Sequence, residues 1–110
     1  MNIELKLTAD QVFGVAKIME QVYETNPTDI NQKVMRSIAI DVADKYNNKQ
    51  HAIYSKQSLF DVKKLYKIAL KFHEAYALHS VLCLFIGTVN DVYINTILQK
   101  IIDNLHQKLS

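Results

Sequence analysis

The stretch from Ala75 to Ile86 places the strongest constraint on the fold, because it carries no charge and is almost entirely apolar. Ten of its twelve residues are apolar or aromatic, and it contains neither glycine nor proline. A run of this length is typical of a buried core helix and is too short to cross a bilayer, which needs about 20 residues. The amphipathic segments on either side are therefore expected to pack around it.

Residues that favour turns are scarce throughout the chain. Two glycines and one proline among 110 residues are far fewer than an all-β domain of this size needs. The length suits one domain. We therefore expect one all-α domain over residues 1–110, arranged like a four-helix bundle.

Capping signals and apolar periodicity predict where the helices lie. Thr8 with Gln11 matches a capping box, and similar signals stand at Thr28 or Asp29 and at Ser58. Pro27 ends the first helix, and the polar run 47–50 ends the second. The predicted helices cover residues 9–24, 29–46, 59–86 and 88–109.

Helical spacing also predicts which side chains are buried. The buried face of helix 29–46 is expected to comprise Val34, Met35, Ile38, Ala39, Val42 and Tyr46. In the first half of helix 59–86, the inner residues are expected to be Val62, Leu65, Tyr66, Ala69 and Phe72. Inner-edge positions are also expected for Tyr23, Tyr46, Tyr66, Tyr76 and Tyr93, whose hydroxyls need partners.

The N-terminus shows a different period. Ile3, Leu5 and Leu7 alternate with polar residues, which predicts a short β-strand at residues 2–7. A strand needs a partner. Three alternatives remain open: it pairs with a second copy of the chain, it pairs with the segment 52–54, or it does not form.

The predicted helix 59–86 is unusually long. Its 28 residues would span roughly 42 Å, whereas the helix at 9–24 would span only ~24 Å. Short helices of one subunit cannot cover such a helix from end to end. Either it breaks near His73–Ala75, or another subunit covers its apolar end. The second alternative predicts a homodimer.

Positive charge is concentrated in the middle of the chain. The net charge is only +2, yet residues 45–71 contain seven lysines and one acid. Lysines four residues apart share one helix face, and the candidate binding residues are Lys56, Lys63, Lys64, Lys67 and Lys71. Such a face is solvated, binds an acidic protein, or binds nucleic-acid phosphates. The chain has a single arginine and no helix-turn-helix or RNA-binding signature.

His79 and Cys83 are the most suggestive pair for chemistry. Because they lie four residues apart, they could supply two zinc ligands or a nucleophile and its base. The alternative is a buried thiol beside a hydrogen-bonded histidine. No second cysteine or zinc motif is present, and no Glu-x-x-His spacing accompanies the acids Glu20, Glu24, Asp41 and Asp44. We therefore expect that the protein is not an enzyme and binds no metal and no cofactor.

These patterns favour a small non-enzymatic helical interaction protein that self-associates or binds another protein. The alternative is a nucleic-acid-associated accessory protein that uses the lysine-rich region 45–71. A cytoplasmic location is expected, because the N-terminus lacks a signal-peptide pattern and the single Cys83 excludes an internal disulfide. No membrane partner is expected.

Overall fold

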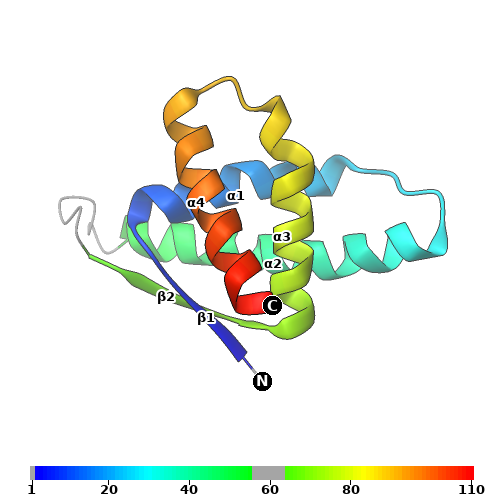
Figure 1. The fold of residues 1–110 in the computed structure, drawn as a ribbon, viewed down its shortest axis with the longest axis horizontal. Coiled ribbons are helices and arrows are strands. Elements are labelled where there is room, and N and C mark those ends of the chain that lie inside the picture. Colours follow the sequence, from blue (N-terminus) through cyan, green and yellow to red (C-terminus); the bar gives the residue numbers. More distant parts are fainter. Residues whose placement is uncertain (1, 56–63) are drawn as a thin grey trace.

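The fold is mainly helical and contains one small antiparallel sheet (Figure 1). The computed structural model describes residues 2–55 and 64–110. In chain order, the elements are β1 (Asn2–Leu7), α1 (Ala9–Met19), the 3-10 helix η1 (Glu20–Glu24), α2 (Ile30–Ser55), β2 (Tyr66–Lys71), α3 (Phe72–Phe85), the 3-10 helix η3 (Ile86–Thr88) and α4 (Val92–Leu109).

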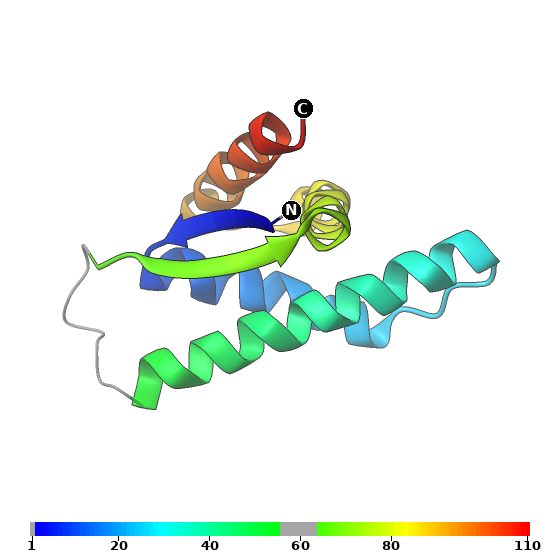
Figure 2. The same ribbon diagram turned by 90° about the horizontal axis from the view of Figure 1, so that it is seen from below.

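The helices are arranged around the inner face of the sheet. Figure 1 shows α1 beside α2, with α3 crossing both of them and α4 next to α3. Figure 2 shows the two strands lying across α1, between α4 and the long helix α2. Side chains from every layer meet in one core, which includes Leu5, Met19, Tyr46, Leu78 and Leu105.

The predicted N-terminal strand is confirmed, but its partner was not among the predicted alternatives. β1 pairs antiparallel with β2, with Ile3 opposite Leu70 and Leu7 opposite Tyr66. The segment 52–54 lies in α2 instead. The sheet forms within one chain because the apolar residues of both strands alternate in phase and face the same core.

The prediction of one helix over residues 59–86 is wrong, because residues 66–71 form a strand. Tyr66, Ile68 and Leu70 are buried, whereas Leu65, Ala69 and Phe72, predicted to lie inside, are exposed. In a helix, the side chains of residues i and i+2 point in nearly opposite directions, about 200° around the axis. In a strand, these two side chains lie on the same face. Ser58, the predicted cap, and Val62, predicted to lie inside, are both outside the described residues.

The apolar stretch Ala75–Ile86 is the core helix that its composition predicted. α3 begins at Phe72, just before the predicted break, and buries Ala75, Ala77, Leu78, Val81 and Leu82. Since the chain is not helical from Tyr66 to Lys71, no 42 Å helix requires covering. The length argument for a homodimer is therefore lost.

α2 continues well beyond the polar run that was predicted to end it. Its last turns bury Ile53, and Tyr54 stacks on Phe13 of α1 with ring centroids 4.8 Å apart. Packing on α1 therefore outweighs the polar composition of residues 47–50, because most helix stability in proteins comes from tertiary contacts.

Two of the predicted N-terminal caps are confirmed. The backbone N–H of Gln11 donates to Thr8 Oγ1 at 3.3 Å, and the backbone N–H of Thr8 donates to Gln11 Oε1 at 2.9 Å. Asp29 Oδ1 accepts from the Gln32 N–H at 2.8 Å. The fourth helix starts later than predicted, at Val92, because the Asp91 carboxylate caps it.

Only part of the predicted tyrosine burial is observed. Tyr46 and Tyr66 are buried, whereas Tyr23, Tyr76 and Tyr93 are largely exposed. The hydroxyls of Tyr23 and Tyr93 find partners at the surface, in Asp44 and Asp10. No helix in the described part of the chain is long and apolar enough to span a membrane.

Candidate functional site

The helix α2 has two halves with different surroundings. We call residues 30–38 the open half and residues 39–53 the covered half. Val34 in the open half is 56% exposed, whereas Val42, two turns later, is fully buried. Figure 2 shows the N-terminal end of α2 extending past α3. The burial predicted for Val34 is therefore wrong, because no other element within residues 2–55 and 64–110 covers its side of the helix.

A groove lies beside the open half, between α2, the end of α3 and the connection that precedes α2. Its volume is about 360 Å³. Leu84 stands at this groove and is 71% exposed. Most of the lining is apolar and comprises Val22, Pro27, Met35, Ala39, Val81, Leu84 and Phe85. We call this feature the α2–α3 groove.

Hydrogen bonds fix one wall of the groove. The Arg36 guanidinium donates from Nε to Thr25 Oγ1 at 3.0 Å and from Nη2 to the Tyr23 carbonyl at 3.1 Å. Thr25 Oγ1 in turn donates to the Val22 carbonyl at 2.7 Å. These bonds hold the segment that joins η1 to α2, so the wall is preformed. Lys33 and Arg36 are the only charged residues in the open half.

The predicted lysine stripe is not one face of a helix. Lys56 and Lys63 lie outside the described residues. Lys67 and Lys71 lie on the exposed face of β2, whereas the Lys64 Nζ lies 5.3 Å from the ring centroid of Tyr66, within cation–π distance. Side chains four residues apart lie on the same side of a strand as well as of a helix. The lysine spacing therefore did not distinguish a strand from a helix.

The sheet adds a lysine that the sequence did not single out. Lys6 of β1 lies directly opposite Lys67, and Asn2 lies opposite Lys71. We call the exposed side of the sheet, with Lys6, Lys67 and Lys71, the basic ribbon face. Its one acid is Glu4, whose carboxylate lies 3.8 Å from the Lys67 Nζ. The alternation of residues 2–7 placed Lys6 on the outer face, but only the strand register shows what it opposes.

Two further lysines of region 45–71 have structural roles. The Lys45 Nζ donates to Glu74 Oε1 at 2.8 Å, and the Lys71 N–H donates to the same oxygen at 2.9 Å. Burial raises the pKa of the Glu74 carboxyl, but these donors outweigh it, so the pKa is lowered overall. The pair joins α2 to the start of α3. The Lys49 Nζ lies 5.9 Å from the Tyr66 ring centroid.

The structure brings His106 of α4 close to the His79 and Cys83 pair. The rings of His79 and His106 have centroids 5.7 Å apart, and Cys83 Sγ lies 3.9 Å from His79 Nδ1. Cys83 is exposed, so the interpretation as a buried thiol is wrong. Within residues 2–55 and 64–110, no three His, Cys, Asp or Glu side chains are grouped closely enough to hold a metal ion.

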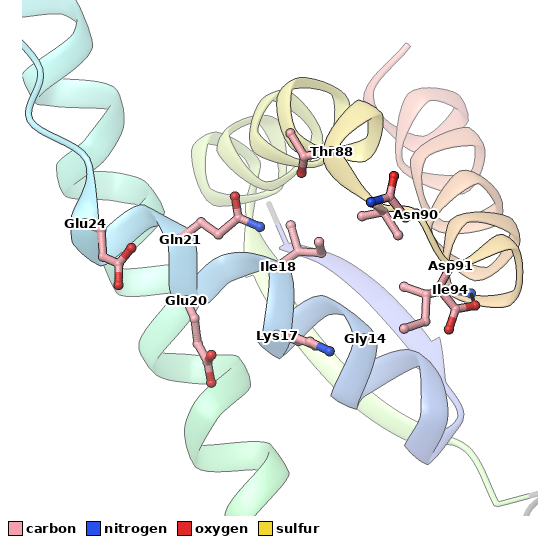
Figure 3. Close-up of a pocket in the computed structure, with 11 residues that line it drawn as sticks. Gly14, Lys17, Ile18, Glu20, Gln21, Glu24, Thr88, Asn90, Asp91 and Ile94 are labelled. Carbon is pink, nitrogen blue, oxygen red and sulfur yellow. Dashed lines mark hydrogen bonds between the residues drawn. The ribbon is translucent and has the colours of Figure 1, made fainter.

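A second cavity, of about 400 Å³, is lined mostly by polar residues (Figure 3). Its walls come from α1 and η1 on one side and from the segment between η3 and α4 on the other. Glu20, Glu24 and Lys17 line it, while Asp91 Oδ1 already accepts the Tyr93 and Ile94 N–H groups. The cavity contains both charge signs, and the Asp91 carboxylate already accepts hydrogen bonds from the chain. Its lining therefore does not indicate a class of ligand.

Three further acids of the described residues, Asp44, Asp10 and Asp41, bond to tyrosines or face solvent. Asp44 Oδ1 accepts from the Tyr23 hydroxyl, and this hydrogen bond raises the pKa of Tyr23 to about 12. Asp10 accepts in the same way from Tyr93 and raises the pKa of that hydroxyl. Asp41 is exposed on α2.

The strongest candidate site is therefore the open half of α2 with the α2–α3 groove, and the second is the basic ribbon face. The first is mainly apolar, and the second carries three lysines and one acid. Comparison of the chain with protein families, curated proteins and solved structures found no match.

Proposed function

We propose that the protein is a small, non-enzymatic interaction protein that self-associates through the open half of α2 and the α2–α3 groove. One observation carries the proposal: a continuous helix places its second half in the core and leaves apolar residues of its first half exposed. Ile30 is 77% exposed and Leu84 is 71% exposed. Clustered exposed apolar side chains of this kind mark interaction surfaces.

The chemistry of the surface suits a second copy of the same chain. Ile30 and Val34 project from the same turns of α2 whose other side lines the groove with Met35. A two-fold axis that packs Leu84 and the groove edge of each copy against the open half of α2 of the other would use the same patch on both subunits, as an isologous interface requires. Few charges interrupt the open half, and the cores of interfaces are depleted in charged residues.

The other elements of the proposal are supported by sequence features. The chain shows no catalytic motif, and its one thiol lies on the surface beside His79. Since Cys83 is the only cysteine, the fold needs no internal disulfide. The lack of a catalytic motif in the sequence supports a binding role, and the single cysteine supports a cytoplasmic location.

Analytical ultracentrifugation across a range of protein concentrations tests the proposal. The wild type is expected to form a dimer as concentration rises. Leu84→Glu and Val34→Glu are expected to remain monomeric, because each places a charge in the interface. Both side chains are more than half exposed in the monomer, so circular dichroism should show an unchanged fold.

Val92→Glu is the matched control. Val92 is 81% exposed but lies at the start of α4, away from the groove lining. This variant should dimerise like the wild type. A wild type that stays monomeric at millimolar concentration contradicts the proposal. If Val92→Glu lost association to the same extent, the interface would not lie at the groove. That result would also contradict the proposal.

A further inference from the structure

The basic ribbon face contains a charge arrangement that the fold does not require. Lys6 and Lys67 are directly opposite each other on neighbouring strands, and both are exposed. Opposed side chains in an antiparallel sheet have Cβ atoms only about 5 Å apart, and like charges at that position destabilise the pairing. The single Glu4 carboxylate, at 3.8 Å from Lys67, offsets only part of this repulsion.

We propose that the basic ribbon face binds single-stranded nucleic acid, with Lys6, Lys67 and Lys71 contacting phosphates and Phe72 stacking on a base. This activity is separate from self-association, because it uses the sheet and the start of α3. A phosphate bound between Lys6 and Lys67 converts their repulsion into two attractive contacts.

The three lysines are spread widely enough to reach more than one phosphate. Lys67 and Lys71 lie on the same side of β2, about 13 Å apart at 3.3 Å per residue. Lys6 widens the charged area across the neighbouring strand. By contrast, Lys45, Lys49 and Lys64 contact Glu74 or Tyr66. The fold therefore separates structural lysines from those of the ribbon face.

Exposed aromatic rings adjoin the lysines. β2 passes directly into α3, so Phe72 follows Lys71 in the chain (Figure 1). Phe72 is 48% exposed, and Tyr76, one turn later on the same side of α3, is 52% exposed. Proteins that bind single strands without reading sequence combine a positive surface with aromatic rings on which bases stack.

The single arginine favours a single strand over sequence-specific binding to duplex DNA. Arg36, in the α2–α3 groove, already donates to Thr25 and Tyr23. Arginine is the usual reader of guanine in the major groove. An exposed ring such as Phe72 can stack only on an unpaired base, so it adds affinity for single strands alone.

The test is fluorescence anisotropy with a labelled oligothymidylate over a series of salt concentrations. The triple variant Lys6→Gln, Lys67→Gln, Lys71→Gln should bind about 100-fold more weakly at 0.1 M salt, with a salt slope smaller by about 2. The variant should remain folded, because it removes the repulsive pair. The control variant Lys17→Gln, Lys100→Gln loses two positive charges from exposed sites elsewhere and should bind like the wild type.

Phe72→Leu separates stacking from charge. It should weaken binding about 5-fold or more and leave the salt slope unchanged, because stacking releases no counterions. Any of three results would overturn the proposal: no binding of the oligonucleotide at low salt, equal loss in the control lysine variant, or duplex bound at least as tightly as the single strand. Competition by polyglutamate as strong as that by oligothymidylate would also overturn it, in favour of an acidic protein partner.

Discussion

The open and covered halves of α2 belong to one uninterrupted helix, yet they differ in almost every contact. Val42 and Tyr46 of the covered half are completely buried. Ile30 and Val34 of the open half are mostly exposed. Apolar residues recur at helical spacing through both halves, so the spacing alone does not distinguish them. Periodicity shows which side of a helix is apolar, but only the neighbouring elements decide how much of that side is covered.

The two halves also differ in how they use polar groups. The covered half holds Lys45, which bonds to the nearly buried Glu74, and Tyr46, whose hydroxyl is buried. The polar contacts of the open half, through Arg36 and the Gln32 N–H, lie near the surface. Substitutions in the covered half should therefore change the stability of the monomer, whereas those in the open half should change mainly its association.

The largest expected difference is between Val42→Ala and Val34→Ala. Val42→Ala should lower the free energy of unfolding by about 2–3 kcal/mol, because it leaves a cavity in the core. Val34→Ala should change it by less than about 0.5 kcal/mol. The gain in helix propensity is the same at both sites and cancels in the comparison. Urea denaturation at low protein concentration measures both values, and equal values would show that the halves do not differ.

Removing the Lys45 contact should have the next largest effect. Lys45→Met should lower the free energy of unfolding by about 1–2 kcal/mol, since it leaves the Glu74 carboxylate without its cation. This range is below that of a fully buried pair, because the Lys45 side chain is 43% exposed. Lys33→Met in the open half is the matched control and should leave stability unchanged. A similar loss in both variants would contradict a specific role for Lys45.

The same variant has a predicted pH dependence. The pKa of Glu74 is lower in the folded protein than its ordinary value, so its contribution to stability is complete above the unfolded pKa, which is about 4.3. That contribution is lost as pH falls through the folded pKa. Without Lys45 the folded pKa rises towards the unfolded value, so the stability lost between neutral and acidic pH should become smaller. Urea denaturation from neutral to acidic pH checks this shift.

The smallest expected effect is a gain in stability. Within the described residues, the Tyr46 hydroxyl is buried without a hydrogen-bond partner, and burial raises its pKa. Tyr46→Phe should therefore raise the free energy of unfolding by about 1 kcal/mol, because it removes an unsatisfied polar group. The exposed Tyr54 provides the control, and Tyr54→Phe should be close to neutral. A loss of stability in Tyr46→Phe would reveal a partner for the hydroxyl, such as an ordered water.

The candidate surfaces could be predicted only in part. Lys67 and Lys71 were identified from the charge pattern, and both lie on the basic ribbon face. Lys6 was not, because its position opposite Lys67 follows from the pairing of strands about 60 residues apart. Leu84 belonged to a stretch predicted to be buried, yet it is 71% exposed at the edge of the α2–α3 groove.

The sequence by itself determined the features that depend on neighbouring residues. These are the capping box at Thr8, the cap at Asp29, the alternation of residues 2–7 and the core helix within Ala75–Ile86. Each follows from interactions over a few residues, such as a side chain that bonds the first turn of a helix.

Only the tertiary structure decided the features that need a distant partner. Residues 66–71 form a strand because β1 pairs with them, and α2 continues to Ser55 because its last turns pack on α1. Ile30 and Val34 in the open half of α2 are exposed because, within the described residues, neighbouring elements cover only the other side of that half. In each case, the free energy of burial depends on which segments meet in space, and local periodicity does not encode that choice.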